Sequence, residues 1–308
     1  MNNLNAKVSI IMPSYKRNAE LVGRAIQSLF AQTYRNIEIV LVDDNAKIEH
    51  KEFREELQRL VATLSDERLV YIENQENLGG AGARNEGINK ATGEYITFLD
   101  DDDEYLPEKV EKQLLFMQEN ELDVCFTSLC IYNENGKLTD VRTHNIISFD
   151  IEYLRKYHLT KQITGTPTFM MKKKVLEDVG GFEIVSMGQE YYLMQKILLN
   201  GTYKLGYDAN CYVKAYRTAA EAISTGKNKI TGEKALFAYK KTFFKILNRK
   251  ERRYVRCRHY AVMAVAYKRN RIYIKTIACL IWATLCSPVT AVKEAIELKK
   301  RIRKVAHE

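Results

Sequence analysis

The first 120 residues alternate between two hydrophobic patterns. Short, continuous apolar runs are typical of parallel strands that are buried on both faces, and they occur at residues 8–13, 37–42, 69–73 and 94–99. Apolar residues three and four positions apart predict an amphipathic helix over residues 19–33. Further helices are expected over residues 52–64 and 107–120, and residues 80–91 are expected to form a loop that turns into a helix. Repeated strand–helix units predict an α/β fold with a doubly wound, mainly parallel sheet.

The pattern is less regular after residue 120. A hairpin is expected over residues 123–141, and a further strand over residues 166–173. A short helix that begins at Val175 should end at Gly180, because glycine readily adopts the left-handed conformation that ends many helices. Another helix is predicted over residues 189–201.

Charge divides the chain near residue 227. The sequence has a net charge of +9, but residues 227–308 carry 22 Lys and Arg against 5 Asp and Glu, a balance of +17. Residues 1–226 carry the remaining 26 and 34, a balance of −8. We expect an α/β domain over residues 1–226 and a basic helical extension over residues 227–308. Its charge favours an anionic partner, either membrane lipid or nucleic acid.

The remaining composition is that of an ordinary globular protein, with 46% hydrophobic and 28% charged residues. The six cysteines have no spacing typical of a metal site, and the N-terminal residues show no export signal. These features predict reduced thiols and a cytoplasmic location.

Acidic side chains follow two of the predicted strands. Asp43 and Asp44 end the second strand, and residues 100–103, which are all aspartates, end the fourth. Pro13 and Tyr15 stand at the corresponding end of the first strand. Because ligands of open parallel sheets bind beyond the carboxyl ends of the strands, we expect these side chains to meet in one cleft.

Four neighbouring carboxylates repel one another, which indicates that they bind a cation. Hard divalent ions such as Mg²⁺ and Mn²⁺ take oxygen ligands, and Mg²⁺ usually binds one or two carboxylates together with substrate phosphates. The cluster therefore predicts a metal ion that holds a leaving diphosphate. A structural alternative is that the aspartates cap the helix after Pro107, a role that suits Asp103 alone.

Five segments together resemble family 2 glycosyltransferases. They are VSIIMPSYKR, AIQSLFAQTYRNIEIVLVDDN, NLGGAGARNEGINKATGEYITFLDDDD, YLPEKVEKQL and KKKVLEDVGGF. The resemblance implies a GT-A fold and an inverting, metal-dependent transfer of a sugar from a nucleotide-diphosphate sugar, usually a UDP-sugar. It implies a glycan or lipid-linked acceptor, Mn²⁺ or Mg²⁺ as the cofactor, and a role in synthesis of bacterial cell-surface polysaccharide.

The resemblance also implies which residues bind the nucleotide. The segment that surrounds the base and ribose is matched by Pro13, Tyr15 and Arg17. The acid that hydrogen-bonds the base is matched by Asp43, with Asp44 beside it. The loop and helix start that line the nucleotide and its diphosphate are matched by Asn77, Gly79, Gly80, Arg84 and Asn85.

The same resemblance assigns the metal ligands and the general base. Asp102 matches the direct metal ligand of the DxD motif, and Asp100 matches the acid nearer the ribose and sugar, which can share the metal. Asp101 lies between them and is grouped with the nucleotide-binding residues. The family's base is a carboxylate at a helix start after the GGF turn. Glu190 stands at that position, and Gln189 precedes it where an acid is common.

The sequence departs from the family at one point. Many relatives have a histidine after the last strands that contacts the metal or diphosphate, but residues 212–224 contain no histidine. Lys214 or Arg217 is the candidate for supplying positive charge there.

Other interpretations are weaker. Gly80 and Gly82 have the spacing of a dinucleotide-binding loop, but Asn85 stands where its third glycine belongs. Haloacid-dehalogenase-type phosphatases need Thr or Val where Glu104 stands. A sugar-nucleotide pyrophosphorylase has a related sheet, but MPSYKR lacks the glycines of its first loop. The last alternative, a non-catalytic basic-tailed adaptor for membrane or nucleic acid, is opposed by the intact acidic motifs.

The extension contains an apolar stretch between Lys275 and Lys293. Its 17 uncharged residues, interrupted by Pro288, are too few for a typical spanning helix. Trp282 and the flanking cations suit a helix that lies in the membrane interface. This predicts an enzyme held at the inner face of the plasma membrane, with no nucleic-acid partner. The alternative is a helix that packs on the domain or in a homodimer contact.

Overall fold

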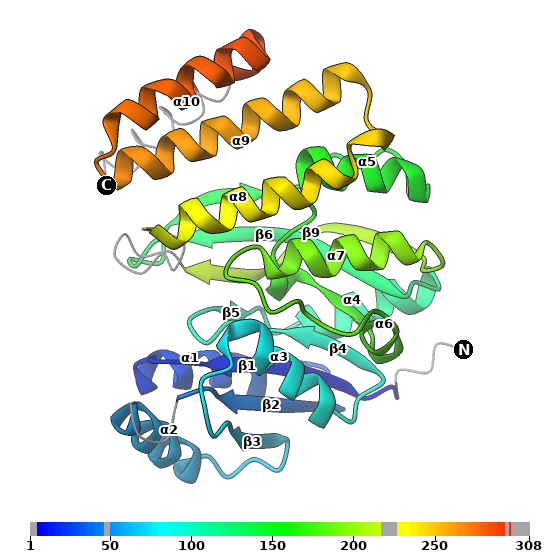
Figure 1. Ribbon diagram of the computed structural model, residues 1–308. Coiled ribbons are helices and arrows are strands. Elements are labelled where there is room, and N and C mark those ends of the chain that lie inside the picture. The colour runs from blue at the N-terminus through cyan, green and yellow to red at the C-terminus, as the bar shows by residue number, and fades with distance from the viewer. Residues whose placement is uncertain (1–4, 46–49, 217–226, 293–295, 297–308) are drawn as a thin grey trace. The chain divides into compact units, whose positions relative to one another are not determined.

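The computed structural model describes residues 5–45, 50–216, 227–292 and 296 (Figure 1). Backbone contacts divide the chain into two compact units. The first unit contains the whole sheet and the helices packed on it. The second contains α5, the short segment 185–188 and the helices that begin with α8.

The first unit is built from strands and helices that largely alternate. Its strands are β1 (Val8–Ser14), β2 (Ile37–Asp43), β3 (Leu69–Glu73), β4 (Tyr95–Phe98), β5 (Glu104–Tyr105), β6 (Val124–Tyr132), β7 (Leu138–Arg142), β8 (Met170–Lys172) and β9 (Leu205–Tyr216). Its helices are α1 (Ala19–Phe30), α2 (Lys51–Thr63), α3 (Gly79–Lys90), α4 (Lys109–Glu119), α6 (Lys173–Val179) and α7 (Gln189–Asn200), with a short 3₁₀ turn, η1 (Thr166–Thr168).

The strands form one sheet in the order β3-β2-β1-β4-β8-β6-β9-β5, and β7 pairs with β6. The neighbours β3, β2, β1 and β4 are all parallel. The chain builds outward from β1 to β3 and then returns to place β4 on the other side of β1. This reversal is the topological switch point at which ligands of such sheets bind. The predicted α/β class with a largely parallel sheet is confirmed.

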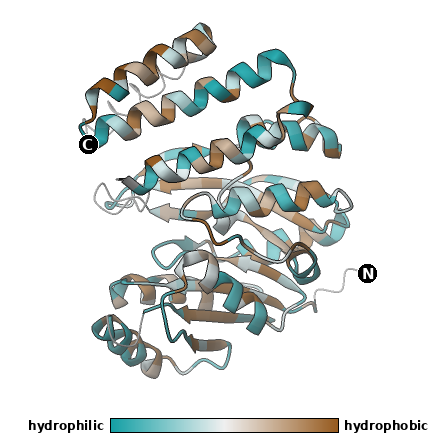
Figure 2. Ribbon diagram, viewed as in Figure 1, coloured by the Kyte–Doolittle hydropathy of each residue, from teal (hydrophilic) through white to brown (hydrophobic). Residues whose placement is uncertain are grey.

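The core of this unit lies where the predicted apolar runs meet the amphipathic helices. All seven residues of β2 are buried, and β1 and β2 are mostly brown in Figure 2. Helix α1 buries Val22, Ala25, Ile26 and Leu29 on one face. Helix α6 ends at Gly180 in the left-handed conformation, at φ 69°, as predicted.

The second half differs from the sequence prediction in several elements. The hairpin of β6 and β7 is confirmed, but the strand expected over residues 166–173 is divided into η1 and β8. The sequence did not predict β9, because polar residues such as Asp208 and Asn210 interrupt its apolar positions. It forms by pairing with β6, where Val124 lies opposite Leu205, and with β5, where Glu104 lies opposite Lys214.

The second unit is helical. It consists of α5 (Ile151–Lys161), α8 (Lys227–Thr242), the 3₁₀ turn η2 (Phe244–Ile246), α9 (Arg249–Arg269) and α10 (Tyr273–Cys286). Helix α9 starts with a capping box in which Asn248 and Glu251 bond each other's backbone N–H groups. Figure 1 shows α9 and α10 lying side by side. Among the helices that the structure describes, none is both long and apolar enough to cross a bilayer.

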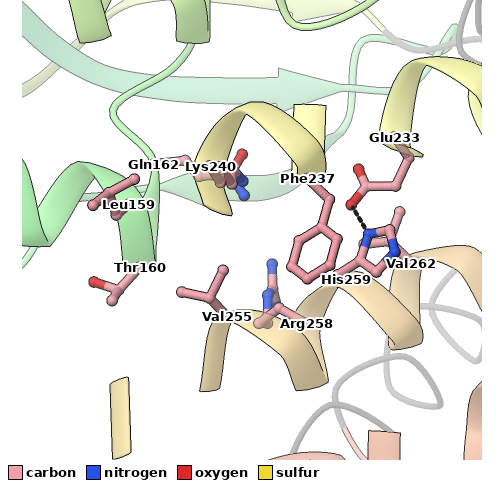
Figure 3. Close-up of a pocket in the computed structure, with 10 residues that line it drawn as sticks. All are labelled: Leu159, Thr160, Gln162, Glu233, Phe237, Lys240, Val255, Arg258, His259 and Val262. Atoms are coloured by element: carbon pink, nitrogen blue, oxygen red, sulfur yellow. Dashed lines mark hydrogen bonds and ion pairs between the residues drawn. The ribbon is translucent and has the colours of Figure 1, made fainter. Parts of the chain in front are cut away.

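A small cavity lies between α5, α8 and α9, with a volume of about 30 Å³, which is room for a water molecule. Figure 3 shows Glu233 and His259 joined at its wall, with 2.9 Å between Oε1 and Nδ1. The ring of Phe237 stacks on His259 at 3.9 Å between centroids. Burial lowers the pKa of Lys240 to about 8; Glu233 opposes this shift and Arg258 adds to it.

The Lys240 pKa predicts a pH dependence of stability. Between pH 8 and the ordinary lysine value of 10.5, the unfolded chain binds more protons at this position than the folded chain. The free energy of unfolding should therefore rise with pH in this window, by up to about 3 kcal/mol from this residue. Urea unfolding between pH 7.5 and 9.5 measures the slope. Lys240→Met should reduce it, whereas the exposed control Lys241→Met should not; equal slopes in all three proteins contradict the prediction.

Candidate active site

The switch point brings three strand ends together at one edge of the sheet. Ser14 at the end of β1 lies opposite Asp43 at the end of β2. On the other side of β1, the backbone N–H of Leu99, just after β4, donates to the carbonyl of Ile11 at 3.1 Å. The segments that begin at Tyr15 and Asp100 therefore leave the sheet at the same edge, as predicted.

The four aspartates after β4 alternate in exposure. The side chains of Asp100 and Asp102 are 38% and 27% exposed. Each pairs with an arginine: Asp100 Oδ1 lies 2.5 Å from Arg84 Nη2, and Asp102 Oδ2 lies 3.0 Å from Arg17 Nη2. The two acids expected to carry the metal are thus the two that face outward.

The other two aspartates are buried and hold the loop. Asp101 Oδ1 accepts from Arg17 Nε at 2.9 Å, and burial raises the pKa of Asp101 to about 6, an effect that Arg17 opposes. Asp103 Oδ1 accepts from the backbone N–H of Tyr216 at 2.9 Å, and burial raises its pKa well above the ordinary value. The capping role considered for Asp103 is wrong, because Glu108 precedes α4 with no side-chain cap.

The donor set suits a hard divalent ion that also binds substrate. Among the described residues, no three His, Cys, Asp or Glu side chains are grouped closely enough to form a complete metal site. Mg²⁺ commonly uses one or two carboxylates and completes its shell with phosphate oxygens and water. Two outward carboxylates, Asp100 and Asp102, fit that mode of binding.

Asp43 is buried at the end of β2 and fully hydrogen-bonded. Its Oδ1 accepts from the backbone and side-chain amides of Asn45 at 2.8 and 2.9 Å. Its Oδ2 accepts from Tyr71 Oη at 2.6 Å and Arg54 Nε at 3.2 Å. These donors occupy all of about four acceptor positions of a carboxylate. A nucleotide base can donate to Asp43 only if one of them moves.

Arg54 is a site-forming residue that the sequence analysis missed. Only 5% exposed, it also donates to the carbonyls of Asn45 and Asn74 and so joins β2 to the loop after β3. A signal was present: Arg54 stands three residues before Leu57 on the buried face of α2, where a charged residue is unusual.

Asp44 organises the loop that leads into α3. Its carboxylate accepts from Asn74 Nδ2 at 2.8 Å, from Asn77 Nδ2 at 3.1 Å and from the backbone N–H of Leu78 at 2.9 Å. Burial raises its pKa despite these bonds. Asp44 and Asn77, both predicted to bind nucleotide, therefore support each other at the rim of the site.

Helix α3 begins with two glycines, Gly79 and Gly80. Gly79 has φ 69°, which favours glycine, and no atom lies within 4 Å of where its Cβ would stand. Leu78 at the N-cap has no side chain that can cap the helix, and the Asp44 carboxylate instead accepts from the backbone N–H groups of Leu78 and Gly79. The N–H groups of a first helical turn attract phosphate, so the turn of α3 that follows Gly79 suits the predicted diphosphate.

Arg84 joins α3 to the acidic loop and to α7. Besides Asp100, it contacts Gln189 Oε1 at 3.1 Å through Nη1. Gln189 opens α7, and the next residue is the predicted base Glu190, which is partly buried in the first turn. This places the start of α7 beside the acidic loop. Gln189 therefore has a positioning contact that the sequence analysis did not anticipate.

Asn85 stabilises the backbone of the GGF turn. Its Nδ2 donates to the carbonyl of Phe182 at 2.9 Å, and its Oδ1 accepts from the Phe182 N–H at 2.8 Å. A Cβ at Gly181 would stand 2.5 Å from Asn85 Oδ1, so the glycine permits this close approach. Asn85 holds the GGF turn that precedes α7.

The remaining predicted residues lie, along the sequence, near the ends of β1 and β9. Tyr15 is 40% exposed next to the partly buried Pro13, and its hydroxyl lies 3.0 Å from His50 Nε2. Lys214 lies in β9 opposite Glu104. Arg217 lies outside the described residues. Arg24, which no sequence pattern indicated, donates to the carbonyl of Asp102 at 2.6 Å and lies over the Tyr216 ring.

The family profile described as Glycosyl transferase family 2 matches residues 9–180, more than half of the chain. The chain belongs to this family. The matched region ends at the GGF turn and contains every predicted nucleotide- and metal-binding residue; Glu190 lies beyond it.

Curated glycosyltransferases are similar over much of the chain. UDP-Glc:alpha-D-GlcNAc-diphosphoundecaprenol beta-1,3-glucosyltransferase WfgD of Escherichia coli is 30% identical over 225 residues, 72% of this chain and 81% of that protein. An uncharacterized glycosyltransferase of Methanocaldococcus jannaschii is 29% identical over 195 residues, 63% of this chain. That match spans 65% of the relative's own length. A separate match to a longer uncharacterized glycosyltransferase of Rickettsia conorii spans only 21% of that protein's length.

Solved structures share the fold at low sequence identity. TarS residues 1–349 of S. aureus, in complex with UDP-GlcNAc, has a TM-score of 0.55 at 16% identity and covers 91% of both chains. Mannosyltransferase PcManGT from Pyrobaculum calidifontis, in complex with GDP-Man and Mn²⁺, has a TM-score of 0.54 at 18% identity over 96% of this chain and 81% of that chain. The GT-A fold predicted from the sequence is confirmed.

Proposed function

We propose that this family 2 glycosyltransferase moves a sugar from a UDP-sugar to a hydroxyl of a glycan or lipid-linked acceptor, with inversion at the anomeric carbon. The observation that carries the proposal is the pair of outward carboxylates, Asp100 and Asp102, at the switch point. The name of WfgD, with its UDP-sugar donor and diphosphoundecaprenol acceptor, supports the substrate classes.

The donor nucleotide is proposed to lie across the strand ends. Its base would lie against the exposed Tyr15 ring beside Pro13, and would reach Asp43 by displacing the Asn45 side chain. Asn77 would line the ribose side. The diphosphate would accept hydrogen bonds from the N–H groups of α3 that follow Gly79, a residue that leaves room for it.

The proposed cofactor is Mn²⁺ or Mg²⁺, held by Asp102 and shared by Asp100. Such an ion neutralises the charge that develops on the departing diphosphate. Arg17 and Arg84 hold the two carboxylates in place and partly neutralise them. Arg84 can turn from Asp100 to the diphosphate, because its guanidinium already lies over the start of α3, 3.1 Å from the carbonyl of Gly80.

Glu190 is the proposed general base. The acceptor oxygen attacks the anomeric carbon from the side opposite the diphosphate, while a Glu190 oxygen takes the acceptor's proton. The anomeric C–O bond breaks and its electron pair leaves with UDP. Proton removal by a positioned carboxylate raises such rates by about 10²- to 10⁴-fold. The contact of Gln189 with Arg84 supports this placement, because it ties the start of α7 to the acidic loop.

The enzyme is proposed to work at the inner face of the plasma membrane, where a lipid-linked acceptor would be accessible. The basic residues of 227–308 would bind anionic lipid there. The alternative role of this extension is to form the contact of a homodimer.

Calorimetry with UDP tests the donor site directly. We expect UDP to bind at least about tenfold more tightly with Mn²⁺ than without it, because Asp100 and Asp102 would hold an ion that attracts the negatively charged diphosphate. ADP serves as the control for base selectivity and should bind more weakly. UDP binding that is indifferent to both Mn²⁺ and Mg²⁺ contradicts the proposal.

Release of pyrophosphate from UTP and a sugar phosphate would instead identify a pyrophosphorylase.

A further inference from the structure

Helix α10 exposes its large apolar side chains. Ile274, Ile277, Leu280, Ile281, Trp282 and Leu285 each expose more than half of their surface, and we call these six the apolar face. The buried positions of α10 are the small Thr276 and Ala283. A helix of a water-soluble domain normally has the opposite arrangement. The apolar face is therefore a surface suited to being covered.

The apolar face is continuous and nearly uncharged. Lys275 is the only charged residue between Tyr273 and Val292. Val289 and Val292 extend the exposed apolar surface past the end of α10. Figure 2 shows α10 as mostly brown along its length. Helix α9 packs along α10, where Cys279 packs against a cluster containing Met263 and Tyr267. The Tyr260 ring of α9 also stacks on Trp282, which still exposes 54% of its surface.

Exposed cations flank both ends of the apolar face. At its beginning lie Lys268, Arg269, Arg271 and Lys275. At its end, Arg253 Nε donates to the carbonyl of Cys286 at 2.6 Å, and the exposed Arg256 follows one turn along α9. Within the described residues 253–292, no Asp or Glu occurs. The surface is thus an apolar strip with positive charge at each end.

This charge pattern distinguishes two possible partners of the apolar face, a second copy of the chain and an anionic bilayer. In a two-fold symmetric dimer the same patch meets itself. Because both ends of the strip are basic, either a parallel or an antiparallel pairing of two copies brings cations against cations. An anionic bilayer instead offers acyl chains to the apolar side chains and phosphate groups to the flanking cations. Tyr273 and Trp282 are of the types that favour the headgroup level.

We propose that the apolar face of α10, with Arg253, Arg256, Arg271 and Lys275 at its ends, inserts into the interface of an anionic bilayer. The helix lies flat in the membrane surface. This deepens the proposed membrane association by assigning the surface that makes it. It depends on neither the metal nor the base, so its failure leaves the proposed transfer reaction intact.

The chain contains a single tryptophan, Trp282, which lies in the apolar face. Its fluorescence therefore reports insertion of this face into a membrane. The full-length protein is mixed with phosphatidylcholine vesicles that contain about one-third phosphatidylglycerol, a fraction that gives a strongly anionic surface. We expect the fluorescence to shift to the blue and brominated acyl chains to quench it. Vesicles of phosphatidylcholine alone should bind at least about tenfold more weakly, as should the anionic vesicles in high salt.

Two exposed double variants form a matched pair for co-sedimentation with the anionic vesicles. Ile274→Asp/Ile281→Asp should weaken binding at least about tenfold, because it places charge in the apolar face. Val141→Asp/Ile147→Asp changes exposed residues of the first unit and should bind as the unmodified protein does. Calorimetry with UDP and Mn²⁺ should give the same result for both, which separates this test from that of the donor site.

Two results would overturn the inference. One is vesicle binding of the α10 variant equal to that of the control. The other is a dimer in sedimentation velocity that Ile274→Asp/Ile281→Asp dissociates, with no binding of the unmodified protein to anionic vesicles. The second result would assign the apolar face to another copy of the chain.

Discussion

Replacing Asp102 with Asn should lower the rate of sugar transfer by about 10²- to 10³-fold, the range found when a charge-stabilising group of an active site is removed. The substitution keeps the shape of the side chain but removes a negative charge from the rim. Asp102 faces outward with its Oδ2 on Arg17, so its role differs from that of the buried Asp101. The measurement is the transfer rate from a UDP-sugar across a Mn²⁺ titration.

The Asp102 variant should stay folded, because the Asp102 carboxylate is partly exposed. The bond from Arg24 goes to the backbone carbonyl of Asp102, which the substitution leaves in place. A thermal unfolding temperature close to that of the unmodified protein would separate lost chemistry from lost structure. Glu119→Gln, an exposed acid of α4, is the control and should transfer at the normal rate. An Asp102→Asn enzyme with unchanged rate and unchanged Mn²⁺ dependence would refute the metal site proposed here.

Replacing Glu190 with Gln should lower kcat by about 10²- to 10⁴-fold, since the amide cannot accept the acceptor's proton. The KM for the UDP-sugar should change little, because the proposed donor contacts lie in β1, β2, α3 and the acidic loop. Steady-state kinetics with varied donor and acceptor separate these parameters. A purely structural role for Glu190 predicts instead that the unfolding temperature falls together with activity.

Glu190→Asp is the matched variant, because it keeps the carboxylate and shortens its reach by one methylene. It should retain far more activity than the Gln variant. Gln189→Ala tests the positioning contact with Arg84: it should weaken donor binding more than it lowers kcat. A Glu190→Gln enzyme whose kcat stays within about threefold of normal, far less than removal of a general base costs, would exclude Glu190 as the base.

Much of the fold was predictable from local patterns. The runs at residues 8–13 and 37–42 became β1 and β2, and the helical spacing of Val22, Ile26 and Leu29 became the buried face of α1. Beyond residue 120, β9 escaped prediction because its polar residues conceal it. It forms through pairing with β6, about 80 residues earlier in the chain.

The candidate site was predictable in its positions but not in its contacts. The sequence placed acids at the ends of β2 and β4, where a parallel sheet binds ligands. It did not indicate that Asp43 is saturated by Arg54, Tyr71 and Asn45. It also gave no sign that the amide of Asn85 is used by the backbone of Phe182.

The sequence by itself determined the alternation of strands and helices over the first 120 residues, the acidic strand ends and the basic character of the extension, because each of these depends on neighbouring residues. Only the tertiary structure decided which aspartates face outward, which arginine holds each of them, and which side of α10 is left uncovered. Asp100 meets Arg84 across 16 positions, and Asp103 meets Tyr216 across 113. Such partners are brought together by the packing of distant segments, which no local pattern encodes.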